Sequence, residues 1–288
     1  LYLYPPKADL QGSLLTISVL EEDILHLDDT DDVTFEGIDF EAGRTRLVAI
    51  TDGTGNVIRN CRMIDSGERA AYITGQRNGI DRCELAYHEM TILFDQLDED
   101  AYDYRYVQTP QENYLTNSLI HHGGVHTTVR MAEHTVGMRI AHNEFHTIGG
   151  QSIQFRGNDH LIEYNELHHV NTHVSDNGVM YAGRDWAHRG TIIQYNYIHD
   201  VHTMFEAVPG YREWLHGVYL DDAQPGMTIQ YNIFSDFGGN CIYHRGGRDN
   251  KFFNNIFHDC ERSAYGTDNV INGVANPASG LWYQTMWR

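Results

Sequence analysis

The sequence has few basic side chains, few cysteines and no long apolar run. Its 288 residues contain 20 Lys and Arg against 40 Asp and Glu, a formal net charge of −20. A surface this acidic repels phosphate backbones, so we expect no nucleic-acid partner. No apolar stretch approaches the ~20 residues of a membrane-spanning helix, so we expect no membrane span. Hydrophobic residues still make up 41% of the chain, as in folded proteins.

The four cysteines and the first residues of the chain are informative about the cellular compartment of the protein. Cys61, Cys83, Cys241 and Cys260 include no pair at CxxC spacing, so zinc and redox motifs of that type are absent. The opening LYLYPPKADL has neither a starting Met nor a basic-then-apolar targeting segment. We expect a fragment of a longer chain from which a leader or a preceding module was removed, and a secreted or periplasmic bacterial protein.

One short unit recurs through most of the chain. Its copies include RIAHNEFHT, LIEYNELHH and IIQYNYIHD, with apolar or aromatic residues three positions before and two positions after a central Asn or Cys. In the third copy these flanking residues are Tyr114 and Leu119. Successive copies are 22, 34, 26, 22, 31, 36 and 23 residues apart. The central column holds Cys61, Cys83, Asn117, Asn143, Asn165, Asn196, Asn232 and Asn255.

These spacings predict a solenoid of stacked parallel strands. Leucine-rich repeats need a leucine-dominated consensus and helical repeats need a 3.6-residue period, and the units show neither. We therefore expect an all-β fold, a right-handed parallel β-helix of about nine rungs, as one domain over residues 1–288. An Asn at an inward bend can satisfy backbone groups, and stacked copies form a ladder. Cys61 and Cys83, in the same column, are expected to be buried thiols.

A second strand lies between the Asn units, with its clearest copies in SIQFRGND, GVMYAGRD, GVYLDDAQ and CIYHRGGR. In the third of these copies, Tyr219 and Asp221 are expected to point outward and Asp222 to fall at the following bend. The alignment of Ile153, Val179, Val218 and Ile242 places four later residues on the same inward face: Phe155, Tyr181, Leu220 and His244.

Carboxylates and guanidinium groups alternate along the strip that follows these strands. Such interleaving is unusual for a purely solvated face, so we expect a substrate-binding surface that also includes Tyr181 and Tyr219. The bend column is expected to hold Gly157, Gly183, Asp222 and Gly246. Two positions further on, a column is expected to hold Asp159, Asp185 and Arg248, with Arg156, Arg184 and Arg245 close by.

Three long connections are expected to wall a groove over the strands GVMYAGRDW and GVYLDD. They are residues 95–112, 168–177 and 200–216, of which the first is acidic and rich in tyrosine and the third is aromatic. Long solenoid connections often gather on the binding face. The sequence therefore places the candidate site beneath these loops.

Glycoside hydrolysis needs two carboxyl groups that flank the scissile bond, about 5–5.5 Å apart in retaining enzymes and about 6.5–9.5 Å apart in inverting ones. Asp185 and Asp222 are one rung and two residues apart, which corresponds to ~8 Å on a flat sheet. Asp176 precedes its strand and can approach from the loop. The candidate catalytic residues are Asp185, Asp222, Asp221 and Asp176, with neighbouring arginines expected to hold a base ionised.

The 18 histidines and the tryptophans are weaker candidates. Most histidines belong to the repeat and are expected to be scaffold, so we expect neither a metal nor a cofactor. His244 is expected to face the strip from the next rung. Trp186 and Trp214 suit stacking on sugar rings, and packing in a loop or core is an equally good interpretation.

The segments SDNGVMYAGRDWAHRGTIIQYNYIHDV, GVYLDD and GGRDNKFFNNIFHDC resemble the bacterial β-helix proteins of glycoside hydrolase family 141. The resemblance is strongest over residues 140–260. It implies a pectate-lyase-like solenoid, α-L-fucosidase or xylanase activity on complex plant polysaccharides, and a pair of catalytic aspartates. By motif these are Asp185 of GRDW, Asp176 of SDNG, and Asp221 or Asp222 of YLDD. The region 95–112 and the tail SGLWYQTMWR depart from the family, which leaves the sugar open.

Two other functions compete with a glycoside hydrolase acting on a poly- or oligosaccharide. A polysaccharide lyase on the same scaffold would use a cation or a basic side chain beside an acidic sugar, and Arg184, Arg245 and Arg248 supply basic groups. A non-catalytic carbohydrate-binding solenoid would need no carboxyl pair, so Asp185→Asn and Asp222→Asn would leave its function intact. The oligomeric state is not specified by the sequence.

Overall fold

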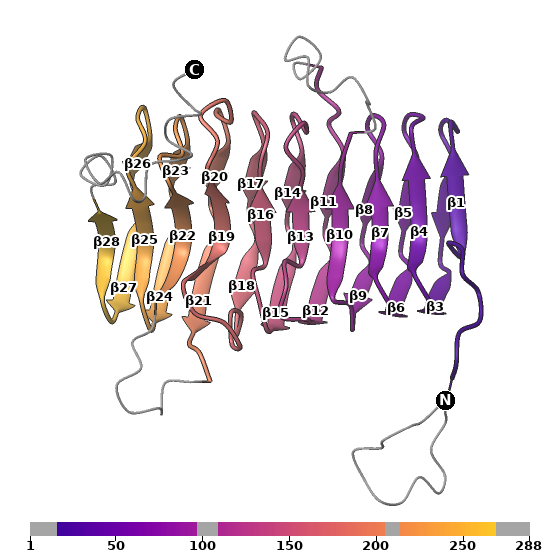
Figure 1. Ribbon diagram of the computed structural model, residues 1–288, viewed down its shortest axis with the longest axis horizontal. Helices are drawn as coiled ribbons and strands as arrows, with labels where there is room; N and C mark the ends of the chain where they lie inside the picture. The colour runs from indigo at the N-terminus through magenta and orange to yellow at the C-terminus, as the bar shows by residue number, and fades with distance from the viewer. Residues whose placement is uncertain (1–15, 97–108, 205–213, 269–288) are drawn as a thin grey trace, which may run out of the picture.

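A computed structural model describes residues 16–96, 109–204 and 214–268, which form 28 short strands. All strand pairs are parallel, and the strands coil through three sheets in turn (Figure 1). One strand from each sheet makes a rung, and the rungs stack from the indigo end to the yellow end of Figure 1. The described part of the chain has no helix long and apolar enough to cross a membrane. The expected parallel β-helix of about nine rungs is confirmed.

Each sheet takes every third strand of the chain. The first sheet has ten strands: β1 (Leu25–Asp28), β4 (Arg46–Thr51), β7 (Arg69–Ile73), β10 (Met90–Phe94), β13 (Val129–Met131), β16 (Ile153–Phe155), β19 (Asn177–Gly183), β22 (Leu215–Asp221), β25 (Asn240–Arg245) and β28 (Ser263–Asp268). The second has nine: β2 (Thr34–Glu36), β5 (Val57–Arg59), β8 (Gly79–Asp81), β11 (Tyr114–Thr116), β14 (Arg139–Ala141), β17 (Leu161–Glu163), β20 (Ile192–Gln194), β23 (Thr228–Gln230) and β26 (Lys251–Phe253). The third has nine: β3 (Asp39–Gly43), β6 (Arg62–Ser66), β9 (Glu84–Ala86), β12 (Leu119–Gly123), β15 (Glu144–Ile148), β18 (Glu166–His168), β21 (Tyr197–Val201), β24 (Ile233–Phe237) and β27 (Ile256–Cys260).

The repeated Asn forms the expected ladder at the bend between the second and third sheets. The side-chain oxygen of Asn196 accepts hydrogen bonds from the backbone and side-chain nitrogens of Asn165, at 3.0 and 2.9 Å. Asn232 accepts in the same way from Asn196. Each amide also donates to a backbone carbonyl, so the ladder satisfies polar groups that the bend would otherwise leave unpaired in the interior.

The predicted register is wrong by one residue at one rung. Leu115, not Tyr114, pairs with Ile140, and the ladder position belongs to Ser118, whose N–H donates to Asn143. Asn117 lies one residue earlier with a φ of 53°, in the left-handed region that asparagine tolerates. The two adjacent bend positions both suit a small polar residue, so the pattern alone did not separate them.

The core fills the space between the three sheets. Inward side chains at equivalent positions of successive strands stack in columns, as in other solenoids. In the first sheet, one such column consists of Ile153, Met180, Val218 and Ile242, which pair in succession. The alignment on Val179 is therefore wrong by one, because Val179 and Met180 both lie in the core. Tyr181 pairs with Tyr219 and so lies on the outer face, not the inner one as expected.

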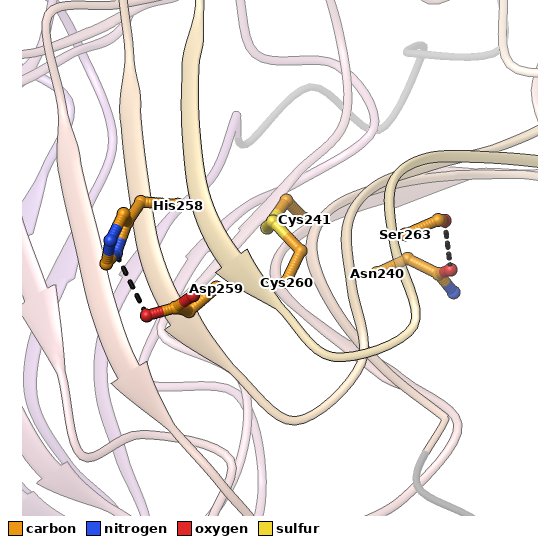
Figure 2. The surroundings of a disulfide bond; sticks show 6 residues. All are labelled: Asn240, Cys241, His258, Asp259, Cys260 and Ser263. Atoms are coloured by element: carbon orange, nitrogen blue, oxygen red, sulfur yellow. Dashed lines mark hydrogen bonds and ion pairs between the residues drawn. A yellow bond between two sulfur atoms is a disulfide. The ribbon is translucent and has the colours of Figure 1, made fainter.

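The cysteines divide into two kinds. Cys61 and Cys83 are free and buried, as expected. Cys241 and Cys260 form a disulfide that joins β25 to β27. Figure 2 shows this bond between the pair Asn240 and Ser263 and the pair His258 and Asp259. The disulfide therefore ties the first sheet to the third near the last described rung.

Several sequence-based expectations fall on residues outside the described ranges. They concern most of the connections 95–112 and 200–216, the N-terminal LYLYPP and the tail SGLWYQTMWR. The remaining connection, 168–177, is described and leads into β19. The single-domain assignment over residues 1–288 stays a prediction.

Candidate functional site

The bend after the first sheet is marked by a column of left-handed residues. Arg184 and Asp222 have φ values of 72° and 40°, and the glycines Gly157 and Gly246 at the equivalent positions have 81° and 71°. Arg184 therefore occupies the place in this column that the sequence assigned to Gly183. The shift of one residue arises because two consecutive residues, Val179 and Met180, both lie in the core.

Gly183 instead pairs with Asp221 at the end of β19. A Cβ atom at Gly183 would lie 2.8 Å from Asp221 Cβ, closer than real Cβ contacts. A larger residue there would displace Asp221. The glycine therefore lets the carboxylate of Asp221 lie against the neighbouring strand.

Asp221 is the centre of the polar cluster. Its side chain is 5% exposed, and it accepts hydrogen bonds from the hydroxyl groups of Tyr181 at 2.9 Å and Tyr219 at 3.0 Å. Arg245 Nη1 donates to it at 3.2 Å. Two phenols and a guanidinium are the donors that an ionised carboxylate needs when it is buried. Burial and the negative charge of Asp221 raise the pKa of both tyrosines, which keeps them protonated as donors.

Asp222 lies next to this cluster and has different hydrogen-bond and ion-pair partners. Arg184 Nε donates to its Oδ2 at 3.0 Å, and Arg245 Nη1 lies 3.6 Å from its Oδ1. Burial and the adjacent charge of Asp221 raise the pKa of Asp222, and the charges of Arg245 and Arg184 oppose this. The two neighbouring carboxyl groups thus have different surroundings: two phenols and a guanidinium donate to Asp221, whereas Asp222 contacts two guanidinium groups.

A surface pocket of about 260 Å³ opens beside this cluster. It is lined by Asp176, Trp214, Tyr219, Tyr243 and Arg245. Asp176 is exposed and ends the connection 168–177, which agrees with its expected approach from the loop. The pocket therefore combines aromatic rings with one carboxylate and the guanidinium that binds Asp221.

Stacked rings form the aromatic side of the pocket. The imidazole of His216 stacks on Tyr243 with centroids 4.3 Å apart and meets Tyr219 edge-on at 4.6 Å. Burial, and then the positive charge of Arg262, lower the pKa of His216 to about 3, so the ring is neutral near pH 7. Arg262 lies over Trp214 at 4.0 Å from the ring centroid. Trp214 remains 39% exposed at the pocket wall.

Other predicted site residues lie elsewhere. Asp159 donates its N–H to the carbonyl of Arg189 and lies against Gly190, so its expected column with Asp185 is wrong. The reason is the connection from β19 to β20, which is longer than the one from β16 to β17. Asp185 accepts a hydrogen bond from Ala187 N–H at 2.7 Å and lies 3.4 Å from His188. The pairing of Asp185 with Asp222 stays a prediction.

His244, Arg248 and Trp186 form local contacts outside the Asp221 cluster. His244 follows the inward column of Leu220 and contacts Asn250 at 2.9 Å and the ring of Phe252. It therefore lies in the inward column that the alignment predicted, and the second expectation, that it faces the outer strip, is wrong. Arg248 lies over the ring of Trp186 at 5.9 Å from its centroid.

Sequence reasoning missed Tyr243, His216 and Arg130. Tyr243 occupies the outward column of Tyr219, and the alignment on Ile242 contained that signal. His216 precedes the strand segment used for the alignment. Arg130 pairs with Gln154, which pairs in turn with Tyr181. Its strand was not among the copies recognised in the sequence.

The histidines of the repeat stack along the third sheet. Rings of His121, His146, His168 and His199 follow one another with centroids 5.0–5.4 Å apart. Within residues 16–96, 109–204 and 214–268, no group of three or more His, Cys, Asp or Glu side chains is placed to hold a metal ion. The stacked rings form one column along the third sheet.

Comparisons with known proteins identify the fold. A family model described as right handed beta helix region matches residues 127–276, more than half of the chain. No curated protein matches the sequence. A solved structure titled glycoside hydrolase aligns with a TM-score of 0.54 at 14% identity, covering 79% of this chain and 39% of that one. The Streptococcus pneumoniae surface protein and adhesin PfbA aligns at 12% identity and a TM-score of 0.39, covering 84% of each chain.

Proposed function

The chain belongs to the right-handed β-helix family, and from this premise we propose that it is a glycoside hydrolase that uses the carboxyl groups of Asp222 and Asp221. The observation that carries the proposal is the contrast between these neighbours. Asp222 has a raised pKa, whereas Asp221 accepts from two phenols and one guanidinium. Pairs of carboxyl groups in such different surroundings are typical of acid and base roles.

In this proposal Asp222 donates the proton to the leaving oxygen. Asp221 provides the negative charge that acts on the sugar or on water. Arg245 Nη1 lies 3.2 Å from Asp221 Oδ1 and 3.6 Å from Asp222 Oδ1, so these oxygens are at most about 7 Å apart, near enough to act on one glycosidic bond. This limit includes the separation of about 5–5.5 Å in retaining enzymes and only the lower end of the inverting range.

The adjacent pocket supports a sugar as the ligand. Trp214 and Tyr243 offer aromatic surface, and Asp176 and Arg245 offer polar groups for hydroxyls. The resemblance to glycoside hydrolase family 141 favours a complex plant polysaccharide. α-L-Fucosidase and xylanase are accordingly the first two activities to assay.

The lyase alternative finds less support in the cluster. Arg184 donates to Asp222 and Arg245 donates to Asp221, so both guanidinium groups hold carboxylates. Arginine stays protonated in proteins and is a poor proton acceptor. A lyase would produce an unsaturated sugar that absorbs in the ultraviolet, whereas a hydrolase produces only a new reducing end.

The test compares single Asp→Asn variants at 222, 221, 176 and 185 with Asp65→Asn. Asp65 is an exposed control with a similar left-handed φ of 56°. We expect Asp222→Asn to lower kcat by ~10²–10⁴ with ligand binding retained, as for loss of a general acid. Full turnover in both Asp222→Asn and Asp221→Asn would contradict the proposal and favour a binding solenoid. The same assays show which of Asp176 and Asp185 takes part.

We also propose that the protein works outside the bacterial cytoplasm, secreted or periplasmic. The disulfide between Cys241 and Cys260 supports this, because such bonds persist in oxidising compartments. Alkylation of the denatured protein, prepared without reductant, should modify only Cys61 and Cys83. Modification of all four cysteines in protein taken from the native cells would contradict the proposal.

A further inference from the structure

Two arginines on the outer face of the first sheet share one carboxylate. Arg130 lies in β13 and Arg156 directly follows β16. Arg156 Nη1 donates to Glu133 Oε1, and Arg130 Nη2 lies 3.6 Å from the same oxygen. Two guanidinium groups therefore meet at the one carboxylate of Glu133 in a chain of net charge −20, and the carboxylate of Asp185 also acts on Arg156 from nearby.

This arginine pair is partly buried and incompletely paired. The side chains of Arg130 and Arg156 are 34% and 28% exposed. Among the described residues, neither Nε atom has a hydrogen-bond partner. Burial and the positive charges of Arg130 and Arg184 lower the pKa of Arg156, and Tyr181 and Asp185 oppose this, so both of these arginines are near enough to repel Arg156. A bound anion would relieve this repulsion.

The arginine pair lies beside the Asp221 and Asp222 cluster. Arg130 shares the outward column of Gln154, Tyr181 and Tyr219. By the same register Arg156 stands two rungs before Asp221, a separation of roughly 10 Å. The position between them is Gly183, which contributes no side chain to the surface. At Gly183, therefore, no side chain covers the surface between the arginines and the carboxyl pair.

We propose that Arg130 and Arg156 form a subsite for an acidic sugar residue, so that the glycan cleaved at Asp221 and Asp222 is anionic. This inference rests on the proposed hydrolase function and adds the class of its substrate. Arginine recognises planar carboxylates and sulfate oxygens through paired N–H donors. The glycan would lie along the coil axis, with an acidic residue over β13 and β16 and a sugar ring in the pocket beside β22 and β25.

The test measures binding to the Asp222→Asn chain by titration calorimetry. The ligands are glucuronoxylan, polygalacturonate and a sulfated galactan, each paired with its carboxyl-reduced or desulfated form. We expect at least one anionic polymer to bind tenfold or more tightly than its neutral counterpart. Preference for the uronates identifies a carboxylate as the group bound, and preference for the galactan identifies a sulfate ester.

Variants link this preference to the arginine pair. Adding Arg130→Gln and Arg156→Gln should remove the preference, whereas the lysine substitutions at both positions should retain part of it. Arg44→Gln, at the far end of the coil, is the matched control and should bind like the parent chain. Circular dichroism of each variant verifies the fold.

Equal affinity for all three polymers and their neutral counterparts would overturn the inference. So would a preference that survives the double glutamine variant. Either result leaves the hydrolase intact if the wild-type chain still releases reducing ends. Conversely, an arginine-dependent preference without cleavage by the wild-type chain overturns the hydrolase and keeps the anionic subsite.

Discussion

Asp221 and Asp222 are consecutive in the chain, yet Arg245 Nη1 lies within 3.6 Å of an oxygen of each. The bend at Asp222, with its φ of 40°, allows both carboxyl groups to reach one guanidinium. Asp221 ends β22 on the outer face, and Asp222 turns toward Arg184 on the preceding rung. The cluster therefore depends on three successive rungs, β19, β22 and β25, being in register.

Removal of one phenol tests the role of Asp221. Tyr219 is 3% exposed, and its hydroxyl donates to Asp221 at 3.0 Å. This hydrogen bond holds the Asp221 carboxylate in place, and misplacement of a reacting group lowers the rate, so Tyr219→Phe should lower kcat about tenfold or more. The measurement is kcat and KM on a cleaved glycan. Tyr164→Phe, which keeps an exposed stacked ring on another face, should have wild-type kinetics. Unchanged kcat in Tyr219→Phe would contradict a role for Asp221 in the reaction.

The parts of the fold that could be predicted are those that repeat. The Asn column from Asn143 to Asn255 and the inward Ile and Phe columns recur at every rung, because each rung must satisfy the same bend and fill the same core. The errors lie where a rung departs from this period. At Val179 and Met180 two consecutive residues face the core, so every later position on that strand shifts by one.

The candidate site was predicted less completely because it is built from these departures. Asp221, Asp222, Arg184 and Arg245 were recognised as a strip, since charged residues on adjacent rungs are visible in an alignment. Their pairing depended on a one-residue shift that the sequence did not reveal. The longer connection after β19 also carried Asp185 away from the column of Asp159.

The Asn ladder should contribute strongly to stability. Asn196 accepts two hydrogen bonds from Asn165 and donates to Ile162, Gln194 and Asn232. Asn196→Ala leaves buried donors and carbonyl groups without partners, at about 1–3 kcal/mol for each group. We expect the free energy of unfolding in urea to fall by at least about 2 kcal/mol.

A matched control for the ladder is Gln230→Ala, which removes a single side-chain hydrogen bond on the outer face, to Gln194. Its effect should remain within about 0.5 kcal/mol, as for most surface substitutions. If the two variants unfold at the same urea concentration, the ladder is not the stabilising element that its hydrogen bonds indicate.

Buried histidines should make the fold sensitive to mild acid. Burial lowers the pKa of His88 and His160 to about 4 and, with the charge of Arg262, that of His216 to about 3. In the unfolded chain each titrates near 6.5. Between these values the unfolded state binds more protons than the folded state, so stability increases with pH. The stabilisation is complete above about pH 6.5 and is lost as the pH falls toward 4.

Urea unfolding at intervals from pH 7 to pH 4.5 measures this loss. Each of the three histidines contributes a slope of up to about 1.4 kcal/mol per pH unit in the lower part of this range. His160→Gln should reduce the total slope by up to about 1.4 kcal/mol per pH unit, because one of the buried histidines is removed. His146, His188 and His244, whose pKa values burial also lowers, contribute to the slope that remains. His142→Gln changes an exposed ring and should keep the wild-type slope. A free energy of unfolding that stays constant from pH 6.5 to pH 4.5 would show that these histidines are not held neutral in the folded chain.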